Sequence, residues 1–266
     1  DQTETIEQLI NNNGTVLFNG GTLITKLTEL NGGTTTIAST LNATVALSIT
    51  GGKNTVSSSG VVSVEGLSLS GVASASIELA SGALNSGRIV LAGDVTAAPP
   101  SGTLRILSSG AGAVPGRLDL NNAQRTFTIS SGQSREDLQI TAQIIGGGTL
   151  GAMIKSGPGT MQLTATNTYS GGTRINGGTL EGIGTAAFGS GSIVFGAGTT
   201  SEGVLGLRSD LAVATFGNAI SAGSVARDIF VDIDRVTTGV ANRFVLGTAS
   251  LGASLSLYGA GTLQLG

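Results

Sequence analysis

The sequence predicts an all-β protein built as a solenoid, in which each short strand stacks on its equivalent one coil later. Three observations lead to this prediction: apolar and polar residues alternate in short runs, glycine-rich turns separate the runs, and the same turn sequence recurs along the chain. The 266 residues include 44 Gly but only 4 Pro and show no Gly-X-Y period, which excludes collagen. An apolar content of 39% and a net charge of -3 exclude a disordered chain.

The strands are predicted from pairs of apolar residues separated by one polar residue, the period of a strand with one face inward. These pairs are Leu104/Ile106, Leu118/Leu120, Phe127/Ile129, Leu138/Ile140, Met161/Leu163, Ile193/Phe195, Leu205/Leu207, Val231/Ile233, Leu255/Leu257 and Leu263/Leu265. Neighbouring pairs often leave room for one turn and none for a crossover helix of about ten residues, so parallel Rossmann and TIM architectures are excluded. A sandwich or barrel of hairpins and a solenoid remain.

Repetition of one turn favours the solenoid. Gly-Gly-Thr begins at Gly20, Gly32, Gly147, Gly171 and Gly177, and Gly-x-Gly-Thr begins at Gly157, Gly196 and Gly259. Glycine suits a corner that needs a positive φ, and threonine suits the strand position after it. With about 20 residues in a coil, we expect about 13 coils and a rod roughly 60 Å long. At the N-terminus, Thr3, Thr5 and Ile6 favour a strand over a helical cap.

The composition excludes several chemistries. The chain has no His and no Cys, so it cannot form a Ser-His-Asp triad, a cysteine nucleophile or a thiolate zinc site. Its 13 basic residues are scattered, which argues against nucleic-acid binding. Its apolar runs are too short for a membrane-spanning helix, so we expect no membrane insertion of this segment.

One strand carries the candidate metal site. Asp228, Asp232 and Asp234 alternate with apolar residues and are expected to share the outward face. They could hold Ca²⁺ or form a carboxylate centre that cleaves a polysaccharide, although calcium needs about 6 to 8 oxygens and a neighbouring coil would have to supply the rest. The favoured interpretation is a solvated face whose carboxylates pair with arginines, with no metal bound. Those arginines are Arg227, Arg235 and Arg243.

Three other features have two interpretations each. Glu136 and Asp137 could be an acid pair, but adjacent strand residues point to opposite faces, and a turn with an ion pair to Arg135 is favoured. Tyr169 and Tyr258 could stack on a sugar, but packing of Tyr169 over its own turn is favoured. The glycines at 110, 112 and 116 match no phosphate-binding motif and predict a loop.

Residues 155–180 closely resemble the autotransporter passenger-associated β-strand repeat. The match rests on Lys155, Gly157, Gly159, Thr160, Leu163, Asn167, Tyr169, Gly171, Gly172, Thr173, Ile175, Gly178, Thr179 and Leu180. Met161 and Ala165 depart from the usual pattern, which has Leu and Gly there. Residues 259–266 resemble the start of another copy. The resemblance implies a right-handed parallel β-helix on the outside of a bacterium, and it brings no catalytic residue.

We therefore expect residues 1–266 to form a single β-helix segment of an extracellular bacterial surface protein or filament, with a role in adhesion or surface display and without catalysis. No cofactor is expected apart from the Ca²⁺ candidate. The expected partners are further copies, end to end or side by side, and surface glycans. Residues 261–266 read on naturally into the first residues, so equivalent units are expected to follow one another. The alternative is a carboxylate-dependent polysaccharide lyase or glycosidase on the same scaffold.

Overall fold

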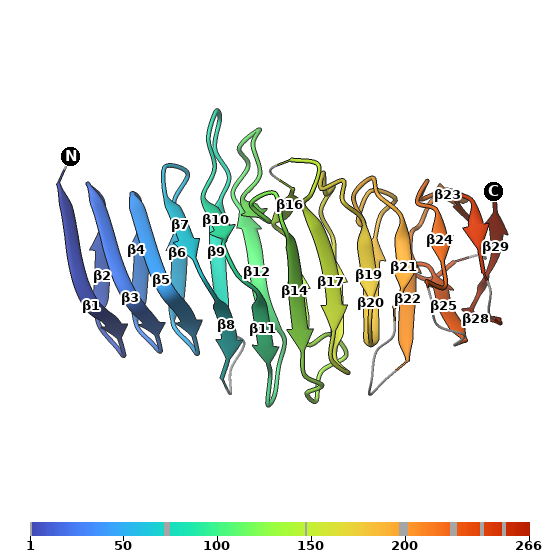
Figure 1. Ribbon diagram of the computed structural model, residues 1–266, viewed down its shortest axis with the longest axis horizontal. Coiled ribbons are helices and arrows are strands. Elements are labelled where there is room, and N and C mark those ends of the chain that lie inside the picture. The colour runs from blue at the N-terminus through green and yellow to red at the C-terminus, as the bar shows by residue number, and fades with distance from the viewer. Residues whose placement is uncertain are drawn as a thin grey trace.

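A computed structural model describes residues 2–71, 75–146, 148–196, 202–223, 228–239, 242–251 and 254–266. Within these ranges the only helices or strands are β-strands, and every pairing between the named strands is parallel. The strands stack into a rod with β1 (Thr3–Asn11) at one end and β29 (Gly261–Leu265) at the other (Figure 1). The parallel β-helix prediction is confirmed; its right-handed winding stays a prediction.

The largest sheet has 15 strands. It begins with three long strands, which are β1, β3 (Thr22–Leu30) and β5 (Thr40–Ile49). One branch continues through β7 (Val61–Val64), β10 (Arg88–Leu91), β13 (Arg117–Asp119) and β16 (Gln143–Ile145). The other continues through β8 (Leu67–Ser70), β11 (Val95–Ala98), β14 (Gln124–Ile129), β17 (Ala152–Ser156), β19 (Thr173–Ile175), β21 (Ile193–Phe195), β24 (Ile220–Ser221) and β27 (Ala249–Ser250).

The second sheet runs along the rod with 11 strands. They are β2 (Thr15–Phe18), β4 (Thr34–Ile37), β6 (Lys53–Val56), β9 (Ser76–Ala80), β12 (Leu104–Ser109), β15 (Leu138–Ile140), β18 (Thr160–Leu163), β20 (Gly178–Ile183), β22 (Gly203–Arg208), β25 (Ile229–Asp234) and β28 (Leu255–Gly259). A third sheet of three strands closes the C-terminal end. It contains β23 (Val213–Thr215), β26 (Asn242–Leu246) and β29.

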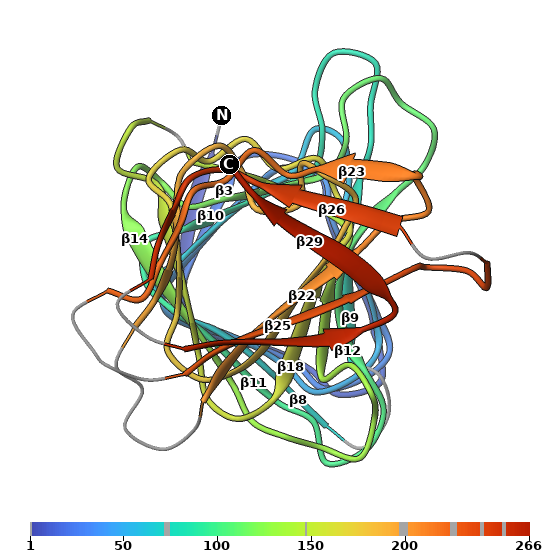
Figure 2. The same cartoon turned by 90° about the vertical axis from the view of Figure 1, so that its right-hand side faces the viewer.

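The cross-section changes at β5. The first half of this strand pairs with β7 and the second half with β8, so one long strand is followed by two short ones. The first coils therefore have two strands each, and the coils from β7 to β18 have three. The branch that begins at β7 ends at β16, so the coils made of β19 with β20 and of β21 with β22 again have two strands. Viewed along the axis, the sheets surround one central space (Figure 2), which the buried side chains fill.

The length of a coil varies far more than expected. The chain advances 18 residues where Thr22 pairs with Thr40, and 34 where Arg105 pairs with Gln139. Eleven strands in the second sheet, about 4.8 Å apart, give a rod of about 50 Å. The prediction of about 20 residues in a coil holds for coils such as the one where Met153 pairs with Thr173. The predictions of about 13 coils and a 60 Å rod are too high, because the longer turns in the middle of the rod use more residues in each coil.

The interior consists of stacked aliphatic side chains, as the apolar pairs predicted. Eight of the ten pairs are buried, including Leu104 and Ile106, which are fully buried. The exceptions are the last two pairs, where Leu257 and Leu265 are 45% and 36% exposed. Both lie in β28 and β29, at the end of the rod, where the described residues supply no further coil to cover them.

The repeated corner also has the predicted conformation. In the four Gly-Gly-Thr turns whose glycines are both described, the second glycine has a positive φ, of 69° at Gly21, 68° at Gly33, 92° at Gly172 and 63° at Gly178. Gly147, which opens the fifth, lies outside the described residues. The N-terminal strand prediction is confirmed by β1. Among the described residues, we find no helix long and apolar enough to span a bilayer.

Candidate functional site

The lysine of the repeat lies inside the solenoid. Lys155 pairs in register with Phe127 on the preceding coil and Ile175 on the next, so its stem extends an inward ladder and the residue is fully buried. Its Nζ donates hydrogen bonds to the carbonyl oxygens of Ser156 at 3.0 Å, Gly157 at 2.9 Å and Gly177 at 3.0 Å. The ammonium group therefore joins the turns of two successive coils.

Burial lowers the pKa of Lys155 from 10.5 to about 7, while the nearby Asp137 carboxylate opposes this shift. Asp137 is itself 2% exposed. Its Oδ1 accepts the backbone N–H of Gly132 and its Oδ2 that of Thr160, both at 2.7 Å. At this corner of the rod, Lys155 thus donates hydrogen bonds to backbone carbonyl groups, and Asp137 accepts hydrogen bonds from backbone N–H groups.

Asn167 bonds to the backbone of two neighbouring coils. Its Oδ1 accepts the N–H of Ile144 at 2.7 Å, and its Nδ2 donates to the carbonyl of Ala187 at 2.6 Å. Asn167 is 5% exposed, and both contacts are buried. One side chain thus replaces two backbone hydrogen bonds at a corner where strand pairing is interrupted.

Tyr169 is fully buried, and its hydroxyl is 2.7 Å from Oγ1 of Thr173. Burial raises the pKa of the Tyr169 phenol above its ordinary value of 10. The prediction that Tyr169 packs at its own turn is confirmed, because Thr173 begins β19 four residues later. A ring with no exposed surface cannot stack on a sugar.

The repeat's glycines let adjacent coils approach. A Cβ at Gly178, where φ is 63°, would lie 2.5 Å from the carbonyl oxygens of Gly157 and Gly159 on the preceding coil. A Cβ at Gly171 would lie 2.8 Å from the Gly151 carbonyl oxygen of the earlier coil, to which the N–H of Gly171 donates at 2.9 Å. The remaining repeat positions take part in the same stacking. They are Gly172, which turns into β19, and Thr160 and Thr179, which pair in register on β18 and β20.

A polar ladder runs along the outer face of the second sheet. Consecutive strands place these residues in register: Arg105, Gln139, Gln162, Glu181, Gly206 and Asp232. The glycine leaves a gap in the ladder. Arg208, two positions further along the same strand, bridges the carboxylates on either side of the gap.

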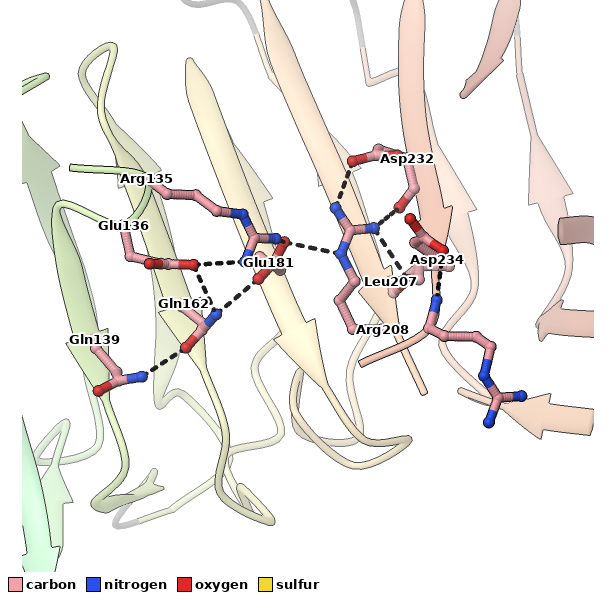
Figure 3. A network of polar contacts seen from close by, with 10 residues as sticks. Arg135, Glu136, Gln139, Gln162, Glu181, Leu207, Arg208, Asp232 and Asp234 are labelled. Carbon is pink, nitrogen blue, oxygen red and sulfur yellow. Dashed lines mark hydrogen bonds and ion pairs between the residues drawn. The ribbon is translucent and has the colours of Figure 1, made fainter. Parts of the chain in front are cut away.

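This ladder carries a connected network of hydrogen bonds and ion pairs (Figure 3). Glu181, which is 3% exposed, accepts hydrogen bonds from Gln162 at 2.7 Å and from Arg135 at 3.0 Å, and its Oε2 lies 3.0 Å from Nε of Arg208. Arg208 then pairs with Asp232. Gln162 also accepts a hydrogen bond from Gln139 at 2.7 Å. The buried carboxylate is thus held between two guanidinium groups.

The three aspartates of the candidate metal site lie on β25 and just before it. Ile229, Val231 and Ile233 are fully buried, which confirms the predicted alternation. Asp232 pairs with Arg208, and Asp234 accepts the backbone N–H of Arg235 at 2.8 Å, while Asp228 is exposed. Among the described residues, no group of three or more His, Cys, Asp or Glu side chains could hold a metal ion.

Asp232 does pair with an arginine, but its partner is Arg208 and not one of the three suggested residues. Nε of Arg235 lies 3.4 Å from Oδ1 of Asp210. Arg243 instead donates to Gln264 at 2.9 Å, and Arg227 lies outside the described residues. The predicted ion pair between Arg135 and Glu136 is confirmed at 2.8 Å.

Sequence reasoning missed the network because its members lie far apart in the chain. Glu181 accepts hydrogen bonds from Arg135, which is 46 residues away in the chain, and from Gln162, which is 19 residues away. One signal was available: Gln162 and Glu181 stand at equivalent positions beside the apolar pairs of successive strands, where stacked side chains meet. Finding that signal requires the coil length, which varies.

Continuous parallel sheets, an aliphatic interior and corners clamped by buried polar side chains define a β-solenoid repeat protein. Residues 153–181 match the family model described as the passenger-associated transport repeat, which confirms the resemblance over that stretch. The chain is similar to an adhesin autotransporter, BmaC, of Brucella suis biovar 1 (strain 1330), with 33% identity over 147 residues. That alignment covers 53% of this chain and 4% of the adhesin, so the chain corresponds to a small part of its length. No solved structure matches the chain.

Proposed function

We propose that this chain is a non-catalytic section of an autotransporter-type passenger, displayed outside a bacterium, where it extends and presents surface for adhesion. The observation that carries the proposal is the clamped repeat: Lys155 and Asn167 turn inward and bond backbone groups, and Tyr169 turns inward and bonds the Thr173 hydroxyl, so these three side chains hold the coils together. Similarity to an adhesin autotransporter supports the cell-surface location.

Surface display is tested on intact cells that produce the native protein. An antibody against this segment is expected to label unpermeabilised cells, and added protease is expected to remove the signal while a cytoplasmic marker stays intact. Labelling that requires permeabilised cells would contradict the location.

The non-catalytic part is supported by the arrangement of the acidic groups. Glu181 and Asp232 are held by arginines, and both oxygens of Asp137 accept backbone N–H groups. Paired glycosidase carboxylates, in contrast, face each other across about 5 to 10 Å of open site. We expect the purified chain to release no reducing ends or unsaturated products from acidic and neutral polysaccharides. Turnover that Asp228→Asn or Asp234→Asn abolishes would support the enzyme instead.

We also propose end-to-end association. β1 pairs on one side with β3, and its other edge has no strand partner among the described residues. Such an edge is able to pair with a strand of another coil or another copy. Ile6 is in register with the buried Thr25 and so faces the open end of the interior, whereas Ile10 is in register with Glu29 on the outside.

These two isoleucines form a matched pair for the test. Ile6→Lys places a charge over the open end of the rod's interior and is expected to abolish concentration-dependent assembly in light scattering. Ile10→Lys makes the same change on the outer face of the same strand and is expected to leave assembly intact. Equal behaviour of the two variants, or no assembly of the unchanged chain, would rule out this mode of association.

A further inference from the structure

Two long turns project from the middle of the rod and touch each other. They are residues 81–87, between β9 and β10, and residues 110–116, between β12 and β13 (Figures 1 and 2). The N–H of Gly82 donates to the carbonyl of Val114 at 3.0 Å, and the N–H of Val114 donates back at 2.9 Å. Leu84, in the first turn, is 88% exposed. The paired turns stand beside the β7–β10–β13 face.

A cavity of about 350 Å³ lies against this face, at the base of the first turn. Its volume is at the lower end of the range of about 300 to 1,000 Å³ found for small-molecule sites. The polar residues that line it are Ser58, Ser59, Asn85, Ser86, Arg88 and Arg117. Hydroxyl and amide groups both donate and accept hydrogen bonds, so this lining suits a ligand that carries several hydroxyl groups.

The two arginines stack in register. Arg88 on β10 pairs with Arg117 on β13, so the two residues leave the sheet on the same face of adjacent strands. Their neighbour Asp119 balances one of the two charges, at 3.6 Å from Nη1 of Arg88, and its Oδ1 is already bonded to the N–H of Asn121 at 2.8 Å. The lining therefore keeps an excess positive charge.

Two polar atoms at this cavity are buried without a partner. Nε of Arg117 has no hydrogen-bond acceptor, and Oγ of Ser86, a residue only 9% exposed, has no hydrogen-bond partner. Buried polar groups in folded proteins are nearly always bonded, so an unpartnered donor and an unpartnered hydroxyl beside one cavity leave hydrogen-bonding capacity that a polar ligand can take up. Guanidinium groups bind carboxylate and sulfate oxygens through paired N–H donors.

We infer that this cavity binds an acidic saccharide unit, with its oxyanion on Arg88 and Arg117 and its hydroxyl groups on the serines and Asn85. The inference deepens the proposed function, on which it rests, by naming the ligand class of the displayed rod. Carboxylate and sulfate share the required chemistry. The turn at 81–87 borders the site, because its Asn85 and Ser86 line the cavity.

The test measures binding of the purified chain to glucuronate, glucose 6-sulfate, glucose and acetate by calorimetry and by chemical-shift changes. We expect saturable binding of glucuronate or of the sulfate, weakened by salt, and none of glucose. The acidic sugar that binds more tightly shows whether the oxyanion is a carboxylate or a sulfate. Arg88→Gln and Arg117→Gln are each expected to weaken binding about tenfold or more, since each removes hydrogen bonds to a charged group.

Arg105→Gln is the matched control, because Arg105 is also a half-buried outward arginine but lies in the second sheet, away from the cavity. It is expected to leave binding unchanged. Ser86→Ala, a smaller change, is expected to weaken binding while the melting temperature stays within a few degrees. Equal binding of glucose, equal binding of acetate, equal loss in Arg105→Gln, or no binding at millimolar ligand would overturn the inference. If the antibody test shows surface display but no saccharide binds, the inference fails and the proposed function stands.

Discussion

Lys155 combines full burial with hydrogen bonds to three carbonyl groups, and this combination makes stability depend on pH. Its pKa is about 7 in the folded chain and 10.5 ordinarily. Between these values the unfolded chain binds a proton that the folded chain does not, so the free energy of unfolding rises with pH. Below pH 7 Lys155 is protonated in both the folded and the unfolded chain, so its contribution to the free energy of unfolding no longer changes with pH.

Urea unfolding between pH 7 and 9 is expected to show this rise, and Lys155→Met is expected to remove it. The range ends below the pH at which Tyr169, with its raised pKa, contributes with the opposite sign. Lys26→Met is the control, because Lys26 is exposed in its ion pair with Glu7. A rise that persists in Lys155→Met would contradict the assignment.

Asn167→Ala leaves a buried N–H of Ile144 and a buried carbonyl of Ala187 without their side-chain partner. We expect a loss of about 2 to 4 kcal/mol in the free energy of unfolding, since each unsatisfied group costs about 1 to 3 kcal/mol. Asn12→Ala, at an exposed asparagine, is expected to change the free energy by less than about 0.5 kcal/mol. Denaturant unfolding measures both variants, and equal losses would contradict the clamp.

The roles of these residues could be predicted only in part. The resemblance identified Lys155, Asn167 and Tyr169 as parts of a motif, but their inward direction follows from burial that the chain spacing does not reveal. A lysine in a run of apolar residues is usually exposed. Here the turn of the next coil offers carbonyl oxygens inside the rod, and that coil is 22 residues away.

At the scale of strands, the outer face of the second sheet depends on Glu181. Glu181→Gln removes a negative charge between Arg135 and Arg208, of which Arg208 is itself 8% exposed. Breaking a buried pair costs about 3 to 5 kcal/mol, so we expect a loss of about 3 kcal/mol in the free energy of unfolding. Thermal and urea unfolding provide the measurement.

Glu7→Gln is the matched control for this prediction. It makes the same substitution in a pair with Lys26 whose side chains are 77% and 64% exposed, and exposed pairs contribute less than about 1 kcal/mol. A loss in Glu181→Gln no greater than that in Glu7→Gln would mean that the network does not stabilise the sheet.

The strands themselves were predictable because period-two alternation reports directly which side chains face inward. The lengths of the turns were not predictable. A turn in a solenoid only has to bring the chain back into register for the next coil, and any further residues in the turn project outward. The glycines at 110, 112 and 116 predict the loop that lies between β12 and β13. Its pairing with the turn at 81–87 depends on a three-dimensional neighbour that lies one coil earlier.

For the whole molecule, the described structure gives no reason for a dependence on calcium. The aspartates of β25 bind an arginine and a backbone N–H, and the described residues contain no metal-binding cluster. We expect the melting temperature to be the same in excess chelator and in millimolar calcium. A calcium-dependent increase that Asp228→Asn or Asp234→Asn abolishes would establish the metal site.

The direction of the hydrogen bonds has a mechanical consequence. Strands lie across the rod, so the bonds between coils point along its axis, and the first and last strands lie at opposite ends (Figure 1). A pulling force on the two ends therefore loads one coil boundary at a time and peels the coils in sequence. A rod of about 50 Å contains 266 residues, or roughly 900 Å of extended chain. Under tension, such a segment lengthens stepwise and dissipates the load.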